Sequence, residues 1–143
     1  MRHFEEYFSK MIKNQKPMNY EKLSELVLKW GEEKGIFTNS TPLRQLDKTQ
    51  EELNETREAL EKLLNMDEKN LQLEFDFVEY FDSGSDEEDI LMEVKDGIGD
   101  MIVTIILLSK MVNMSSVDCL QAAYDVIKMR TGRMVDGQFV KDN

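Results

Sequence analysis

Residues 93–108 read Glu-Val-Lys-Asp-Gly-Ile-Gly-Asp-Met-Ile-Val-Thr-Ile-Ile-Leu-Leu. The half that begins at Met101 is apolar on every side of a helix, which is typical of a helix buried in a bundle or an oligomer. The half before it carries Glu93, Asp96 and Asp100 at steps of three and four, so the three carboxylates share one helical stripe. Carboxylates beside a buried helix need a counter-ion, because an unpaired charge is costly to remove from water. The stretch therefore predicts a central helix with a cation site at the start of its buried half.

Further helices are expected on both sides of this one. Apolar residues at helical spacing predict helices over 2–14, 19–35, 42–65, 87–113 and 115–131, and residues 36–42 are expected to form a loop. Residues 66–87 form an insertion of uncertain structure, since its alternating apolar residues permit either a strand or a helix. Asp136-Gly137 favours a tight turn, which predicts a small hairpin over 135–139. The predicted fold is all-α and four-helix-bundle-like, in a single domain over 1–143 with a short C-terminal hairpin.

The composition excludes several classes of protein. The 143 residues carry a net charge of −11, which disfavours binding to nucleic-acid polymers, because that binding depends on Lys and Arg at phosphates. The single cysteine, Cys119, cannot form an internal disulfide, which fits a reducing cytoplasm. No apolar signal region follows the charged N-terminus, and the apolar run 101–108 is shorter than the about 20 residues that span a bilayer. We expect a cytoplasmic protein without a membrane segment.

A second group of carboxylates lies on the helix over 42–65. Glu52 and Glu55 are three residues apart and share a helical face with Lys48, four residues before Glu52. Two antiparallel helices could present four or five carboxylates to one space, and such a cluster would suit Mg²⁺. In a chain this acidic, about six acid pairs at a spacing of three arise by chance, so spacing alone favours a solvated acidic face.

Two glycines interrupt the central helix between the acidic residues. Gly97 and Gly99 each cost about 1 kcal/mol relative to alanine within a helix. They indicate that a backbone or a ligand comes close at this point. A simple contact between two helices explains them equally well.

At these residues the chain resembles the MazG-like nucleoside triphosphate pyrophosphohydrolases. That group also contains the all-α dimeric dUTPases and the phosphoribosyl-ATP pyrophosphohydrolases. The family pattern is Glu-x-x-Glu on one helix and Glu-x-x-Asp on the next. Here Lys48-Thr-Gln-Glu-Glu52-Leu-Asn-Glu55 is similar to the first half, and 93–103 is similar to the second. Residues 122–140, Ala-Ala-Tyr-Asp-Val-Ile-Lys-Met-Arg-Thr-Gly-Arg-Met-Val-Asp-Gly-Gln-Phe-Val, are similar to the tail of the phage-like branch.

The second half of the pattern can be aligned in two ways. In many members the aspartate directly precedes the apolar run, which would make it Asp100 and would place Gly97 at the glutamate position. The literal Glu-x-x-Asp is Glu93 and Asp96, one turn earlier. Glu93 and Asp100 are about 10 Å apart along a helix, so they would serve two ions, or one ion and a water. All three residues remain candidates, with Asp96 and Asp100 ranked above Glu93.

The resemblance implies a MazG-type fold and an activity. The expected reaction converts a nucleoside triphosphate to a monophosphate and pyrophosphate with the help of Mg²⁺ or Mn²⁺. The resemblance implies Glu52 and Glu55 as the catalytic residues. The metal ligands it implies are Glu52, Glu55, Glu93, Asp96 and Asp100. Lys48, Lys128 and Arg130 would hold phosphate oxygens, Trp30 would stack on the base, and Asn39 would read a base edge. Core packing is the commoner role for a tryptophan such as Trp30, and surface solubility explains the cations at least as well. We expect a homodimer or homotetramer, because the apolar helix half exceeds what a small bundle buries. The alternatives are a dUTPase-like or phosphoribosyl-ATP specificity, and a non-catalytic acidic helical interaction module.

Overall fold

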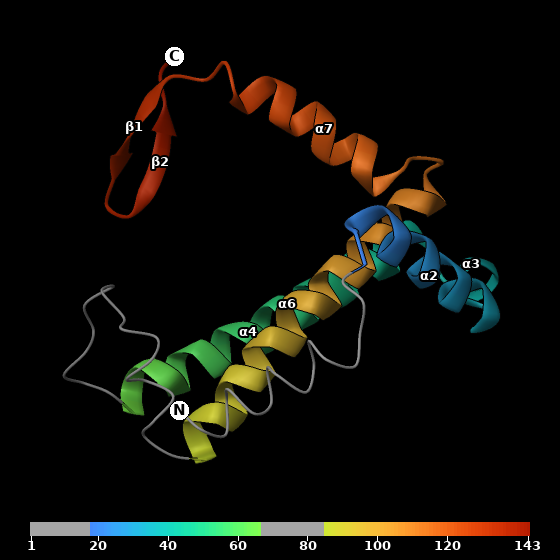
Figure 1. The fold of residues 1–143 in the computed structure, drawn as a ribbon, viewed down its shortest axis with the longest axis horizontal. Coiled ribbons are helices and arrows are strands. Elements are labelled where there is room, and N and C mark those ends of the chain that lie inside the picture. Colours follow the sequence, from blue (N-terminus) through green and yellow to red (C-terminus); the bar gives the residue numbers. More distant parts are fainter. Residues whose placement is uncertain (1–17, 67–84) are drawn as a thin grey trace.

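The computed structural model describes residues 18–66 and 85–143, and most of these residues are helical (Figure 1). In chain order the elements are α2 (Tyr20–Glu33), α3 (Ile36–Asn39), α4 (Pro42–Met66), α6 (Ser85–Met111), α7 (Ser116–Ile127), β1 (Gly132–Val135) and β2 (Gln138–Lys141). The predicted helix at 2–14 and most of the predicted insertion at 66–87 lie outside the described residues.

The two longest helices, α4 and α6, lie side by side along most of their length and run in opposite directions (Figure 1). Two contacts fix their register. The hydroxyl oxygens of Thr49 and Thr104 are 2.7 Å apart, and a β-carbon at Gly97 would collide with the side chain of Thr56. On each helix seven residues separate the two contacts, which is about two helical turns.

The contact between α4 and α6, called the seam below, follows steps of three and four. Its members are Gln45, Thr49, Glu52, Thr56, Ala59 and Leu63 on α4, and Val94, Gly97, Met101 and Thr104 on α6. Such steps keep one side of each helix against its partner. Ala59 and Leu63 are 1% and 5% exposed, so the apolar part of the seam lies toward the end of α4.

α2 packs against the C-terminal part of α6. It begins at Asn19, whose side chain accepts a hydrogen bond of 2.8 Å from the N–H of Lys22. A β-carbon at Gly31 would lie 2.6 Å from Cδ2 of Leu107, so any larger residue would force the Leu107 side chain to shift where the two helices cross. Ile106 and Leu107 are buried here, and they form the second part of the small core.

α7 leaves the end of α6 at a bend of 100° and carries the C-terminal hairpin away from the other helices (Figure 1). The hydroxyl groups of Tyr20 and Ser116 lie 3.1 Å apart and tie its first turn to α2. In the hairpin β1 and β2 are antiparallel, with Val135 opposite Gln138. Asp136 and Gly137 both have positive φ, 49° and 79°, as a two-residue turn of this kind requires.

The all-α class and the C-terminal hairpin are confirmed, whereas the MazG-type arrangement stays a prediction. The predicted loop at 36–42 contains the short helix α3. Gly35 adopts φ 73°, which ends α2, and its carbonyl accepts hydrogen bonds from the side chains of Thr38 and Asn39. The last helix ends at Ile127, earlier than predicted, because the N–H groups of Met129 and Arg130 bond to carbonyls three residues back and tighten the turn.

The apolar half of α6 is only partly covered by the described residues. Ile106 and Leu107 are buried, but Ile102 and Ile105 are 39% and 44% exposed. The expectation of a helix covered on all sides is therefore not met within one chain's described residues. In those residues, no single helix is both long enough and apolar enough to cross a membrane.

Candidate functional site

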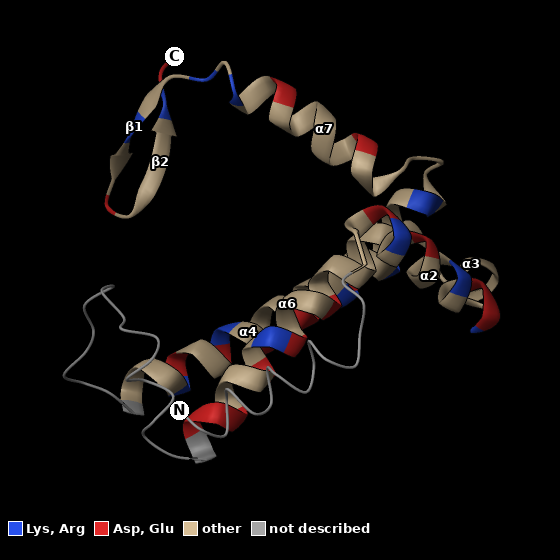
Figure 2. Ribbon diagram, in the orientation of Figure 1, with Lys and Arg blue, Asp and Glu red and all other residues tan. Residues whose placement is uncertain are grey.

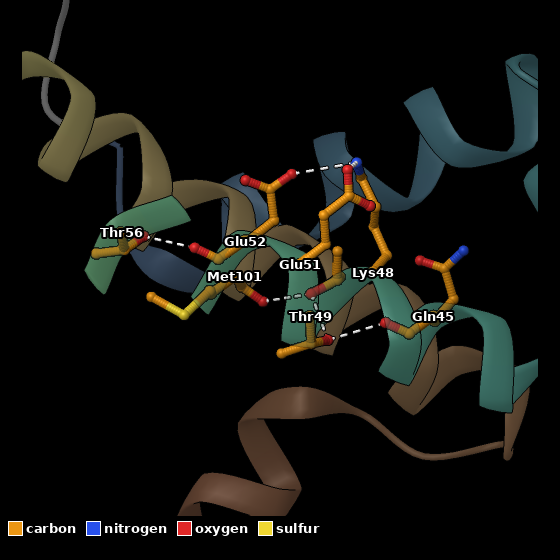
Figure 3. A network of polar contacts seen from close by, with 8 residues as sticks. Gln45, Lys48, Thr49, Glu51, Glu52, Thr56 and Met101 are labelled. Carbon is orange, nitrogen blue, oxygen red and sulfur yellow. Dashed lines mark hydrogen bonds and ion pairs between the residues drawn. The ribbon is translucent and has the colours of Figure 1, made fainter. Parts of the chain in front are cut away.

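Glu52 is the one predicted site carboxylate that is buried. It occupies the seam between Thr49 and Thr56, and its side chain is 11% exposed. Nζ of Lys48 lies 3.4 Å from the Glu52 carboxylate and 3.1 Å from the Glu51 carboxylate (Figure 3). The hydrogen bond to Glu51, followed by that to Glu52, raises the pKa of Lys48 above its ordinary value of 10.5. Lys48 thus serves as the counter-ion of Glu52 in this structure.

The side chains that flank Glu52 in the seam are short and polar. The Thr56 hydroxyl donates a hydrogen bond of 2.7 Å to the backbone carbonyl of Glu52 (Figure 3). One turn away, the paired hydroxyls of Thr49 and Thr104 lie within hydrogen-bond distance of the carbonyls of Gln45 and Met101. These short side chains let the two backbones approach closely enough to cover the stem of Glu52.

The two glycines of the central helix have different surroundings. Gly97 is buried against Thr56, so the contact between two helices accounts for it. Gly99 has no neighbour within 4 Å that a β-carbon would meet. Of the two explanations left open by the sequence, the helix–helix contact is the one that fits Gly97.

The other four predicted carboxylates, Glu55, Glu93, Asp96 and Asp100, are exposed. Each of them comes one residue before a seam position, as Lys48 does. Viewed from one end of the pair, the chains of two antiparallel helices wind in opposite senses, because one chain advances toward the viewer and the other away. Positions one residue before the seam therefore lie on the same side of both helices. We call this side the acidic face. The clusters predicted on two helices therefore share one face of the α4–α6 pair.

The carboxylates of the acidic face do not converge into a metal site as they stand. Among residues 18–66 and 85–143, no three His, Cys, Asp or Glu side chains are close enough together to hold an ion. The carboxylates of Glu55, Glu93, Asp96 and Asp100 are exposed, and Glu52 is paired with Lys48. The predicted five-ligand set is therefore present on one side, but it is not assembled.

The predicted substrate-binding residues are widely separated. Lys48 alone lies beside the carboxylates. Trp30 is on α2, 45% exposed and next to the crossing at Gly31, so it is not a core residue within the described chain. The Asn39 amide donates to the Gly35 carbonyl at 2.8 Å, which gives it a local role in shaping α3.

The two predicted basic residues near the end of α7 are far from the seam (Figures 1 and 2). Nζ of Lys128 lies 2.8 Å from the Asp125 carboxylate and 5.7 Å from the ring centre of Tyr124. Arg130 is exposed beyond the end of α7. Within one chain, neither cation is brought to the acidic face.

Two features of this region were not predicted. One is the seam pairing of Thr49 and Thr104, which no local pattern indicates because the residues are 55 positions apart. The other is an open cavity of about 630 Å³ where α2 and α3 meet the end of α6, lined among others by Lys29, Phe37 and Lys110. Its residues come from three elements, so its position depends on the packing of α2.

No family model, no curated protein and no solved structure matches this chain.

Proposed function

We propose that the protein is a divalent-cation-dependent hydrolase that cleaves nucleoside triphosphates to monophosphates and pyrophosphate, with a role in nucleotide-pool housekeeping. The observation that supports this most strongly is the buried Glu52 at the edge of a face that carries the exposed carboxylates of Glu55, Glu93, Asp96 and Asp100. A carboxylate placed for solubility alone would stay in water, because its burial costs free energy unless it is paired. A buried carboxylate beside exposed ones, with a lysine next to it, suits the binding of a divalent cation together with a phosphate.

The residues of the acidic face have distinct proposed roles. Glu52 is held by the seam and provides a fixed ligand position. Glu55 lies on the same face one turn later and is exposed, so it can accept a proton from an attacking water. The ammonium of Lys48 is about half exposed and can exchange Glu51 for a phosphate oxygen. Asp96 and Asp100 face the same space from α6.

Mg²⁺ or Mn²⁺ bound with the triphosphate would supply a Lewis acid and lower the pKa of a bound water. Mg²⁺ usually takes one or two carboxylates and completes its shell with water and substrate phosphates. The proposal therefore needs fewer converging protein ligands than the five candidates. The MazG-type fold is part of the same proposal, with dUTP or phosphoribosyl-ATP as alternative substrates.

A second candidate is a non-catalytic helical module that uses its acidic surface to bind a basic partner. The pairing of Lys48 with both Glu51 and Glu52 favours it, because the buried carboxylate already has a counter-ion. Thermal unfolding separates the two candidates. Mg²⁺ together with a non-hydrolysable triphosphate should raise the Tm of the enzyme, whereas a module without a nucleotide site should not respond.

The direct test is a pyrophosphate-release screen over the common and modified nucleoside triphosphates. We expect release with at least one of them in Mg²⁺, and loss of that activity on chelation. In ¹⁸O-water the label should enter the monophosphate, because the water attacks the α-phosphorus. Label in orthophosphate, or activity that survives the chelator, would contradict the proposal, and so would the absence of turnover with every nucleotide.

A further inference from the structure

A second cavity, called the α7 cavity below, lies where α7 leaves α6 (Figure 1). It has a volume of about 330 Å³, and its walls come from α2, from the end of α6 and from the turn that leads into α7. Ser24, Lys110, Asn113, Ser115 and Ser116 are among the residues that line it. Each of these side chains carries a hydrogen-bond donor, and none of the described residues that line the cavity is Asp or Glu. In a chain with a net charge of −11, a cavity of this kind is suited to an anion.

The first turn of α7 brings backbone N–H groups to the α7 cavity. The N–H of Cys119 donates to the Ser115 carbonyl at 3.0 Å. The N–H groups of Ser116, Val117 and Asp118 come before it, where a helix has no carbonyl of its own to accept them. Ser115 is the N-cap of α7, yet its side chain makes no capping hydrogen bond. The positive end of the helix dipole is therefore open to an anion at this point.

Ser24 of α2 provides an observation that does not depend on the helix terminus. This serine is 8% exposed, and it lines the α7 cavity. Its hydroxyl has no hydrogen-bond partner in the part of the chain that the structure describes. Buried hydroxyls are normally paired, because an unpaired one has lost its hydrogen bonds to water without a replacement. A ligand oxygen in the cavity would provide the partner that the protein does not.

Lys110 supplies a full positive charge. It lies in the last turn of α6, and it lines both the α7 cavity and the larger cavity beside α3. Within residues 18–66 and 85–143 no carboxylate forms an ion pair with its ammonium, whereas Lys48 and Lys128 are paired. An unpaired ammonium, a buried hydroxyl and the first turn of a helix all donate hydrogen bonds, and a phosphate group has enough oxygens to accept from all three.

We propose that the α7 cavity binds a phosphate group, held by the N–H groups of the first turn of α7, the Lys110 ammonium and the Ser24 hydroxyl. The volume is sufficient, because a water molecule takes up about 30 Å³ of the liquid and the cavity measures about 330 Å³. The ligand is free phosphate or the phosphate of a small monoester. This site shares no residue with the acidic face, so it does not rest on the reaction proposed above.

The test is a titration of the full, ¹⁵N-labelled chain with inorganic phosphate, followed by the NMR signals of its backbone amides. The buffer contains EDTA, so that no metal at the acidic face recruits phosphate, and the ionic strength is held constant. The amide signals of Ser116, Val117 and Asp118 should shift and saturate, because their N–H groups gain a hydrogen bond to a charged oxygen. Shifts that do not saturate, or that chloride reproduces, would overturn the proposal.

Parallel titrations identify the source of the phosphate group. Adenosine monophosphate that binds more tightly than inorganic phosphate would identify a monoester as the ligand, and weaker binding would identify free phosphate. Acetate, which has only two oxygens for the same donors, should bind more weakly than phosphate. Acetate that binds as tightly as both phosphates would overturn the assignment of a phosphate site.

Variants of two lysines locate the site. Lys110→Gln removes the charge and should weaken phosphate binding at least about tenfold, as expected for a hydrogen bond between charged groups. Lys29→Gln is the matched control, because Lys29 lines the larger cavity and not the α7 cavity. It should change the affinity by less than about twofold, since salt screens the more distant charge. Equal losses in the two variants would place the anion in the larger cavity and overturn the proposal.

Ser24→Ala distinguishes a ligand contact from a structural role, because stability and binding should change in opposite directions. Without phosphate the variant should have a higher Tm than the wild type, since an unpaired buried hydroxyl is removed. Its affinity for phosphate should fall at least about tenfold, and phosphate should raise its Tm less than that of the wild type. A lower Tm with unchanged phosphate affinity would show that the Ser24 hydroxyl serves the fold and not the ligand.

Discussion

Gly97 of α6 faces Thr56 of α4 so closely that a β-carbon at position 97 would collide with the Thr56 hydroxyl. The hydroxyl of the same threonine donates a hydrogen bond to the backbone carbonyl of Glu52. The contact therefore fixes the distance between the helices at the level of the buried carboxylate. A change at Gly97 is expected to act on the seam and on Glu52 together.

Gly97→Ala and Gly99→Ala form a matched pair on one helix. At Gly97 the added methyl group must displace Thr56, and overpacking of this kind costs about 1–3 kcal/mol, more than the gain in helix propensity of about 1 kcal/mol. At Gly99 no atom lies within 4 Å, so the gain remains. Urea unfolding should show a lower free energy of unfolding for Gly97→Ala and a higher one for Gly99→Ala. Equal effects of the two substitutions would contradict the close contact.

The hydroxyls of Thr49 and Thr104 have two protons for three contacts. They lie 2.7 Å apart, and each is also within reach of a backbone carbonyl, that of Gln45 or that of Met101. At 2.7 Å the two oxygens need a proton between them, so one hydroxyl donates to the other and gives up the hydrogen bond to its own carbonyl. Replacing either threonine with valine should cost about 1 kcal/mol, and the double variant should cost less than the sum of the two.

A double-mutant cycle in urea measures this coupling. A cycle between Thr104→Val and Thr38→Val provides the control, because Thr38 bonds only within the turn at Gly35 and should be additive. Additivity in the Thr49 and Thr104 cycle would mean that the two hydroxyls do not interact.

The long helices could be predicted because their signals are local. Pro42 marks the start of α4, and the steps of three and four in α6 extend over many turns. α3 could not be predicted in this way, since four residues are too few to show a period. The bend of 100° after α6 follows Asn113, whose φ is 59°, an angle that no helical period indicates, and the hydroxyl contact between Tyr20 and Ser116 joins residues 96 positions apart.

The residues of the candidate site could be named from the sequence, but which of them is buried could not. Glu52 and Glu55 share a helical face by their spacing, yet the structure buries Glu52 and exposes Glu55. The difference arises because α6 contacts α4 at Thr49 and at Thr56, and Glu52 lies between these two contacts. Spacing groups residues within a helix, whereas the partner helix decides which member of the group is covered.

The raised pKa of Lys48 makes a prediction about pH. A lysine whose pKa is raised on folding stabilises the fold at pH values below its unfolded pKa, here 10.5, and loses that contribution as the pH rises through the folded value. Lys48→Gln should therefore lower the free energy of unfolding at neutral pH by no more than about 1 kcal/mol, because the pair is exposed on one side. The difference from wild type should shrink above pH 10.5. A difference that is constant between pH 7 and pH 11 would show that the ion pairs with Glu51 and Glu52 do not form.

The roles of the carboxylates are separable by measuring turnover and stability in the same variants. Glu55→Gln and Asp100→Asn change exposed groups of the acidic face, so they should abolish pyrophosphate release and leave the Tm unchanged or slightly higher, because like charges are removed. Glu52→Gln should also abolish turnover, but it removes the buried partner of Lys48 and should shift the Tm. Glu61→Gln, an exposed carboxylate on another side of α4, is the control and should keep full activity. Near-normal turnover in Glu52→Gln, or equal losses in Glu61→Gln and Glu55→Gln, would show that the acidic face is a solvated surface and not a site.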